Sequence, residues 1–197
     1  MARPRNPETE RRILEIALRH LTEEGYSRMS VDRIALEAGA SKPTLYRRWA
    51  SKADLAMAAV SSLQLSEPAV DTGSTTGDLI GILRNFRRNL LRPNGMALVG
   101  TVLAEEAHTP ELLRLFREKL VAPRRASLAA VLERARKRKE LRPGINIPAA
   151  VNMLVGGIYA HYLASPDIPE SYPAELVKIV WGGIARPVSG KATESSR

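Results

Sequence analysis

The stretch from Ser30 to Lys52 constrains this chain most, because it reads as two short helices joined by a tight turn. The apolar positions of the first helix recur at helical spacing and are Val31, Ile34, Ala35 and Ala38. Ser30 and Ser41 can cap the two helices, and Gly39 supplies a turn residue that tolerates positive φ. Pro43 falls in the first turn of the second helix, where proline costs little. This layout predicts a helix-turn-helix, whose second helix enters a groove of DNA.

Helical periodicity continues through the rest of the chain, and no strand alternation is evident. The sequence therefore predicts an all-α fold of about nine helices. One long helix is expected from Thr109 to about Lys139, with Pro123 as a kink or break. The last two helices are expected over 148–165 and 173–186.

Composition shifts divide the chain into expected regions. Residues 1–52 form the helix-turn-helix domain, which includes a basic arm at 1–7, and residues 53–186 form a larger helical domain. Residues 66–77, rich in Ser, Thr, Gly and Pro, are expected to be a loop between the two parts. The polar tail 187–197 is expected to be disordered.

The charge balance narrows the function classes. A net charge of +9 favours polyanions, with nucleic acid ahead of an anionic membrane surface. The absence of cysteine excludes disulfides and fits a cytoplasmic location. No signal peptide is evident, and no run approaches the length that a transmembrane helix needs, so no membrane association is expected. The three histidines are too scattered for a metal site, and we find no catalytic or cofactor-binding motif, so neither an enzyme nor a cofactor is expected.

The second helix of the motif carries the residues expected to touch DNA. Lys42 can reach a guanine edge or a phosphate, and the methyl group of Thr44 suits a thymine methyl. Tyr46, Arg47 and Arg48 are long enough to contact phosphates, and Arg47 or Arg48 could contact bases instead. The full predicted interface is Arg28, Ser30, Ser41, Lys42, Pro43, Thr44, Tyr46, Arg47, Arg48, Ser51 and Lys52.

This stretch resembles the TetR/AcrR family of one-component transcriptional regulators over about residues 8–63. The matching positions are Ser30, Ile34-Ala35, Ala38-Gly39, Ser41, Thr44-Leu45-Tyr46, Trp49, Ser51-Lys52 and Leu55. Trp49 stands where phenylalanine is commoner, and Pro43 where glycine or alanine is more usual. The resemblance implies that Ser30 and Lys52 bind phosphates, that Tyr46 contacts the DNA backbone, and that residues 41–44 with Arg47 read the site. Arg3 and Arg5 either follow the DNA or only solubilise the arm.

The second half resembles the helical ligand-binding and dimerisation domain of the same family. Its framework appears in Pro110-Glu111-Leu112, Phe116, Ala122-Pro123-Arg124-Arg125, residues 131–135, residues 139–143 and Leu154-Val155-Gly156-Gly157. A small-molecule pocket is expected to be mostly apolar with a few polar groups. The candidates are Phe86, Asn89, Leu98, Thr101, Val102, Glu105, His108, Phe116, Asn152, Tyr159 and Tyr162, each of which could instead be an ordinary core or surface residue.

The glycine pairs at 156–157 and 182–183 allow helices to approach closely. They indicate either a homodimer interface made from the last two helices or close packing inside one subunit, and the resemblance favours the dimer. The expected interface residues are Leu154, Gly156, Gly157, Ile158, Leu176, Ile179, Val180, Trp181, Gly183 and Ile184.

Together these features predict a dimeric regulator, most often a repressor in such families. It would bind a palindromic site on double-stranded DNA and be released by a small-molecule effector. The alternative is a DNA-binding protein without an effector. The basic run 134–142 is either a second nucleic-acid patch or, better supported, a solvated helix end.

Overall fold

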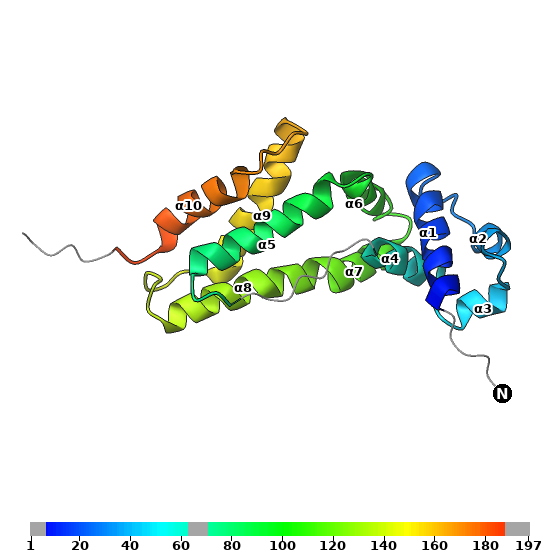
Figure 1. Cartoon of the computed structure of the whole chain (residues 1–197), viewed down its shortest axis with the longest axis horizontal. Helices are drawn as coiled ribbons and strands as arrows, with labels where there is room; N and C mark the ends of the chain where they lie inside the picture. The colour runs from blue at the N-terminus through cyan, green and yellow to red at the C-terminus, as the bar shows by residue number, and fades with distance from the viewer. Residues whose placement is uncertain (1–6, 63–70, 188–197) are drawn as a thin grey trace, which may run out of the picture. The chain divides into compact units, whose positions relative to one another are not determined.

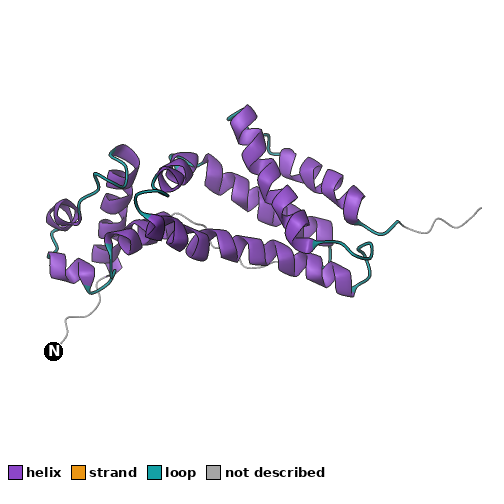
Figure 2. Cartoon of the chain, turned by 180° about the vertical axis from the view of Figure 1, so that it is seen from behind, coloured by secondary structure: helices purple, strands orange, loops and turns teal. Residues whose placement is uncertain are grey.

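The structure is a computed structural model that describes residues 7–62 and 71–187, and helices dominate both segments (Figures 1 and 2). The bounds are α1 Pro7–Glu23, α2 Val31–Ala38, α3 Lys42–Tyr46, α4 Lys52–Ser62, α5 Thr75–Leu91, α6 Gly95–Ala104, α7 Pro110–Phe116, the π-helical segment η1 Arg117–Val121, α8 Ala122–Lys137, α9 Ile147–Ala164 and α10 Tyr172–Ile184. The all-α prediction is confirmed. Nearly all of the predicted arm and tail, and part of the 66–77 loop, lie outside the described residues.

The chain divides into two compact units. Unit 1 comprises Met1–Glu67 and Arg88–Arg124, and unit 2 comprises Pro68–Arg87 and Arg125–Arg197. The helices α5 and α8 therefore contribute residues to both units. The predicted division at residue 52 follows the sequence motif rather than these units, and it stays a prediction.

Unit 1 has one apolar core that the helix-turn-helix shares with later helices. The helix α1 packs against α2, α4 and α6, and α4 packs against α7. Ile13 of α1 and Ile34 of α2 are fully buried in the same cluster as Leu112 of α7. Because one core joins these helices, the helix-turn-helix is held by residues far along the chain.

The long helix predicted from Thr109 is continuous but not uniform. The helices α7, η1 and α8 follow one another without a break and form one continuous helix over residues 110–137. Counted in this way, the described residues hold nine helices. Pro123 neither breaks nor ends this continuous helix, contrary to one of the two expectations. The π-helical turns of η1 end two residues before Pro123. A proline lacks the N–H that an α-helix needs, and irregular turns next to it relieve that demand.

In unit 2, α9 and α10 pack closely around a glycine. A Cβ at Gly157 would lie 2.7 Å from a methyl carbon of Leu176, so any side chain there would require Leu176 to move. The hydroxyl of Tyr172 donates a hydrogen bond to the carbonyl oxygen of Gly157 at 3.2 Å. Gly157 therefore serves packing inside one subunit, which was the alternative reading of the glycine pairs.

Four of the predicted dimer residues face the interior of unit 2, namely Leu154, Ile158, Leu176 and Val180. Side chains packed inside the subunit offer little area to a partner, and the assignment of these four residues to the dimer surface stays a prediction. The outward faces instead carry Met153 and Leu163 on α9 and Ile179 on α10, each more than half exposed. An apolar helix has no polar face to mark its outside, so its sequence pattern does not show which side is buried.

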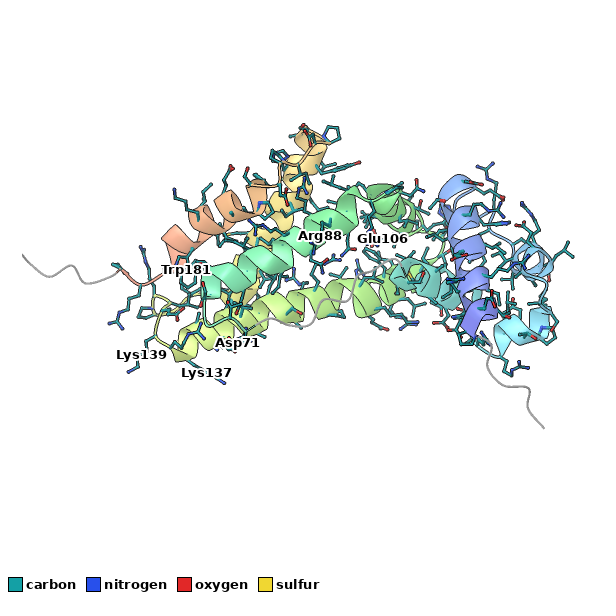
Figure 3. All side chains as sticks on the ribbon, viewed as in Figure 1. Asp71, Arg88, Glu106, Lys137, Lys139 and Trp181 are labelled. Carbon is teal, nitrogen blue, oxygen red and sulfur yellow. The ribbon has the colours of Figure 1, made fainter. Side chains whose placement is uncertain are left out.

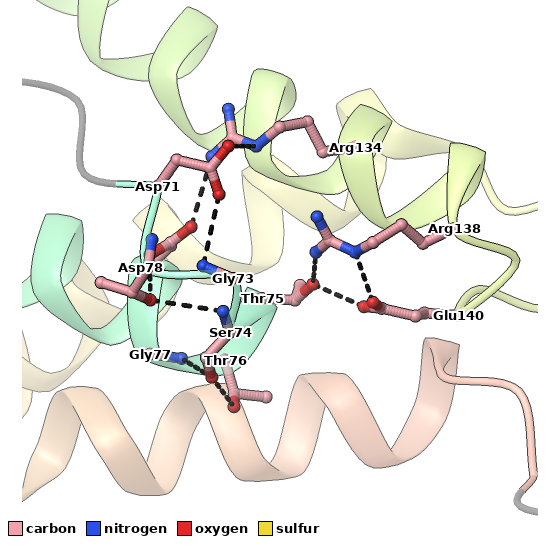
Figure 4. Close-up of polar contacts among 11 residues, drawn as sticks. Asp71, Gly73, Ser74, Thr75, Thr76, Gly77, Asp78, Arg134, Arg138 and Glu140 are labelled. Carbon is pink, nitrogen blue, oxygen red and sulfur yellow. Dashed lines mark hydrogen bonds and ion pairs between the residues drawn. The ribbon is translucent and has the colours of Figure 1, made fainter.

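A polar network joins the start of α5 to the end of α8 (Figure 4). The side chain of Asp78, which is 4% exposed, accepts hydrogen bonds from the Thr72 backbone and hydroxyl at 3.1 and 2.7 Å and from Arg134 at 3.3 Å. Burial opposes the charged form of Asp78, but these hydrogen bonds outweigh it and lower the pKa of the carboxyl group. Next to it, Arg138 bonds to Glu140 at 2.6 Å.

Part of the basic run 134–142 is therefore taken up by ion pairs within unit 2. Arg134 and Arg138 are tied to carboxylates, whereas Lys137 and Lys139 are exposed at the end of α8 (Figure 3). This division fits the solvated helix end better than a continuous basic patch.

By length and composition alone, α9 is apolar enough to cross a membrane. One such helix is weak evidence for a membrane span, so the expectation of no membrane association stays a prediction. Val151, Leu154 and Ile158 of this helix are buried in the interior of unit 2.

Candidate nucleic-acid interface

Local capping sets the geometry of α2 and α3, as predicted. The Ser30 hydroxyl oxygen accepts from the backbone N–H of Arg33, and that of Ser41 from Thr44, both at 3.4 Å. Gly39 adopts φ 64° and ends α2 in the left-handed conformation that favours glycine. Ser51 caps α4 in the same way, accepting from Asp54 at 3.0 Å. These serines fix where each helix begins.

A charged cluster holds α2 against α1. His20 is buried, and its Nε2 lies 2.9 Å from a Glu37 carboxylate oxygen of α2. Both terminal nitrogens of Arg33 donate to Glu24 at 2.8 Å. The hydrogen bond with His20 lowers the pKa of Glu37, and the hydrogen bond with Arg33 lowers the pKa of Glu24. Both carboxylates are thereby kept charged where they join the two helices.

The recognition helix α3 is shorter than expected. Arg47 and Arg48 were expected on this helix together with Tyr46, but α3 ends at Tyr46. The amides of Arg48 and Trp49 both bond to the carbonyl of Leu45 at 2.9 Å, which closes a tight turn. Leu45 is buried in the core, whereas Tyr46 and Arg47 point to solvent. The outward side of α3 is therefore polar and accessible.

The predicted DNA-contacting cations differ in whether they form ion pairs with other residues of the chain. Lys42 is bound to Asp32, and this hydrogen bond raises its pKa. Arg48 is bound to Glu10 of α1 at 3.0 Å and is only 19% exposed. The side chain of Arg47 has no ion pair or hydrogen bond with any residue that the structure describes.

Two further predicted cations contact the protein backbone. Lys52 donates to the Ser27 carbonyl at 3.2 Å, and its ammonium lies 4.5 Å from the centre of the Tyr26 ring. Burial lowers its pKa. Arg28 donates to the carbonyl of Glu24 at 3.0 Å, and its side chain is exposed. Lys52 is thus anchored to the loop before α2, while Arg28 remains at the surface.

The predicted pocket residues fall in both units. In unit 1, Leu98, Val102 and Phe116 belong to the core that the helix-turn-helix shares, whereas His108 is exposed. In unit 2, the Phe86 and Tyr159 rings meet edge to face with centroids 5.2 Å apart. Intermediate or exposed positions are occupied by Asn89, Thr101, Asn152 and Tyr162. The pocket assignment stays a prediction.

Glu105 has a contact that sequence reasoning missed. The Ser27 hydroxyl donates to Glu105 at 2.5 Å, and Thr109 donates to its other oxygen at 3.2 Å. Ser27 and Glu105 are 78 positions apart, so no local pattern could have paired them. Asp32 was also missed as a partner of Lys42, because the motif marks it only as a favourable charge in the first turn of a helix.

An N-capped pair of short helices with a glycine turn and an exposed polar recognition helix defines a helix-turn-helix DNA-binding protein. Comparison with known proteins agrees. The family described as "Bacterial regulatory proteins, tetR family" matches residues 13–59, and "Tetracyclin repressor-like, C-terminal domain" matches residues 69–180. The chain belongs to the TetR family of transcriptional regulators, which are not enzymes.

Individual relatives cover most of the chain. The uncharacterized HTH-type transcriptional regulator YdeS of Bacillus subtilis is 30% identical over 98% of this chain and 96% of its own. A DNA-binding transcriptional repressor TetR of Mycobacteroides abscessus is 36% identical over 65% of this chain and 68% of its own. The solved structure of the Flavonoid-responsive Regulator FrrA shares the fold, with a TM-score of 0.72 at 23% identity over 93% of this chain and all of that one.

Proposed function

We propose that this regulator is a cytoplasmic repressor that binds a palindromic operator as a homodimer and leaves it when a small molecule binds its helical domain. The observation that carries the DNA-binding part is the exposed face of α3, with Tyr46 and Arg47 outward and Leu45 buried beneath them. A helix held this way can enter a major groove without disturbing the core.

We assign the contacts by what each side chain is free to do. Arg47 and Arg28 bind phosphates, since both are exposed. Tyr46 contacts the backbone, and residues 41–44 face the bases. Ser30 and Ser51 lie at the starts of α2 and α4, where backbone N–H groups attract phosphates, and Lys52 adds charge beside them. Arg48 is left out, because Glu10 holds it against α1.

The dimer proposal rests on the outward faces of α9 and α10. On α9, exposed positions recur at spacings of three and four residues, and on α10 Ile179 lies beside two exposed glycines. These positions are Met153, Gly156, Ala160 and Leu163, with Ile179, Gly182 and Gly183 on α10. A Cβ at Gly156, Gly182 or Gly183 would touch nothing within 4 Å, so the room that they leave is open to a second copy. Such a two-fold arrangement would present two recognition helices to successive major grooves.

The repressor and effector parts rest on relatives. The M. abscessus protein is named a repressor, and FrrA is named flavonoid-responsive. An effector that binds one conformation better than the other lowers DNA affinity by its differential affinity for the two.

A gel-shift titration with duplexes from upstream of the gene itself tests the proposal. We expect a preferred palindromic segment whose binding weakens steeply with salt, because phosphate contacts release counterions. Footprinting would then give the operator, and titrating the complex with flavonoids would test release. Equal affinity for upstream and random duplexes would refute a regulatory role, whereas a site that no compound releases would favour the effector-free alternative.

A further inference from the structure

An ion pair connects the two helices of the DNA-binding motif at the surface expected to meet DNA. Asp32 lies in the first turn of α2, and Lys42 is the first residue of α3. The ammonium nitrogen of Lys42 is 2.9 Å from each carboxylate oxygen of Asp32. The Asp32 side chain is 67% exposed and the Lys42 side chain 49% exposed, so both stay accessible while paired.

Stability does not explain this pair. An ion pair between solvent-exposed side chains adds little to folding, because water screens it and two long side chains must be held in place. A carboxylate at a DNA-binding face also opposes binding, since the phosphates repel it. Asp32 favours the start of α2 through its place in the first turn, but it is an unfavourable residue for non-specific DNA binding.

The first turn of a recognition helix is the part that approaches base edges, whereas phosphates flank the groove. Lys42 occupies this turn, and its contact places the Asp32 carboxylate beside it. The groups in a major groove that can donate to a carboxylate are the amino groups of cytosine and adenine. A lysine in the same place donates best to the O6 and N7 atoms of guanine.

We propose that Asp32 and Lys42 together read one G·C base pair, with Lys42 donating to guanine and Asp32 accepting from the cytosine N4 amino group. This inference rests on the proposed operator-binding function and adds a specificity determinant to it. The donor and acceptor of the pair lie side by side, as do the guanine O6 and cytosine N4 groups that they would meet.

The same complementarity distinguishes G·C from the other pairs. An A·T pair also carries an acceptor, N7, beside its amino group, so the discrimination depends on register: with Lys42 at the central position, where guanine has O6, an A·T pair turns its amino group toward Lys42 and thymine O4 toward Asp32. The reversed pair, C·G, places the guanine acceptors against Asp32 and the amino group against Lys42. The hydrogen bond with Asp32 raises the pKa of Lys42, which favours the charged form of the donor.

The test is selection of bound sequences from duplexes with one randomised half-site, followed by affinity measurements by fluorescence anisotropy. The proteins are the wild type, Asp32→Ala, Asp32→Asn, Lys42→Ala and the control Glu15→Ala. Glu15 is a matched control, because it is also 67% exposed and ion-paired, but with Arg11 on α1. Glu15→Ala removes one negative charge, as the two Asp32 variants do, so it corrects for the general gain in DNA affinity that they share. Circular dichroism confirms that each variant is folded.

We expect the wild type to require G·C in one orientation at one position of the half-site. Asp32→Ala and Lys42→Ala should each lose at least about fivefold of the discrimination at that position. Asp32→Asn should shift the preference toward A·T, because an amide both donates to and accepts from adenine. Glu15→Ala should keep the wild-type preference.

Two results would overturn the inference in different ways. If the wild type selects an operator and Asp32→Ala selects the same one with undiminished discrimination, Asp32 only restrains Lys42, and the proposed function survives. If the wild type selects no sequence at all, the proposed function fails and the reading of a base pair fails with it.

Discussion

The hydroxyl of Ser27, in the loop before α2, donates a 2.5 Å hydrogen bond to Glu105, which follows directly after α6. This contact fastens the loop that leads into the DNA-binding helices to a helix more than seventy residues away. The bond involves a charged acceptor, and such bonds are stronger than neutral ones. We expect Glu105→Ala to lower the free energy of unfolding by roughly 1 kcal/mol, measured by urea titration.

Glu106→Ala is the control for this variant. Glu106 makes an exposed ion pair with Arg117 at 3.5 Å, so its loss should change stability by less than about 0.5 kcal/mol. Equal effects of the two variants would show that the Ser27 contact contributes nothing of its own.

Arg47 is expected to neutralise one phosphate. Arg47→Ala should weaken binding to every duplex and lower the slope of log affinity against log salt by about 1. Arg48→Ala, which removes a cation already bound to Glu10, should leave this slope unchanged. Anisotropy titrations at several salt concentrations measure both, and a larger change for Arg48 would reverse the assignment.

Acid should weaken the contact between α1 and α2. The hydrogen bond with His20 lowers the pKa of Glu37 below its ordinary value of 4.5, so the charged carboxylate stabilises the folded state above that pH. This stabilisation is lost as the pH falls below about 4.5 through the lowered pKa. Melting temperatures from pH 3 to pH 7 should therefore decline less on acidification in His20→Gln than in the wild type.

A variant of the Arg33–Glu24 ion pair separates its contribution from that of the His20–Glu37 hydrogen bond. Arg33→Gln releases Glu24, whose pKa is lowered by Arg33, and should also flatten the acid decline. Identical pH profiles for the wild type and both variants would mean that neither carboxylate stabilises the fold through these bonds.

In unit 2, the buried carboxylate of Asp78 is expected to matter more than its exposed neighbour. Asp78→Asn weakens the bonds from Thr72 and Arg134 at a site shielded from water, and we expect a loss of about 1–3 kcal/mol in unfolding free energy. Asp71→Asn removes another carboxylate from the same arginine, but one that is 57% exposed, and should cost less than about 0.5 kcal/mol. Denaturant titrations that rank the two in the opposite order would contradict the role given to burial.

The outward face of α10 is expected to form the dimer. Ile179 is 72% exposed, and Ile179→Arg should yield a monomer, measured by size-exclusion chromatography with light scattering. Leu36→Arg is the control, because Leu36 of α2 is even more exposed and belongs to unit 1, whereas α9 and α10 belong to unit 2. A dimer that survives Ile179→Arg would move the interface elsewhere.

Local chemistry was readable from the sequence. Ser30, Ser41 and Gly39 were placed correctly, because a cap or a left-handed turn depends only on residues within one helical turn. The helix-turn-helix followed from them. The partners of Lys42, Arg48 and Lys52 were not readable, since each cation had several carboxylates or carbonyls within reach and the fold decides between them.

The buried face of α9 escaped prediction for a different reason. Leu154 and Met153 are both large and apolar, yet one is fully buried and the other is 58% exposed. Hydrophobic periodicity separates faces only when the opposite face is polar. In this helix the choice is made by α10, through the packing of Leu176 on Gly157.

That packing has an evolutionary consequence. The isobutyl group of Leu176 occupies the space that any side chain at position 157 would need, so the two positions share one fixed volume. A larger residue at position 157 is compatible with this packing only if the Leu176 side chain moves or becomes smaller. We therefore expect substitutions at positions 157 and 176 to occur together in relatives that keep this fold, which an alignment of homologues would test.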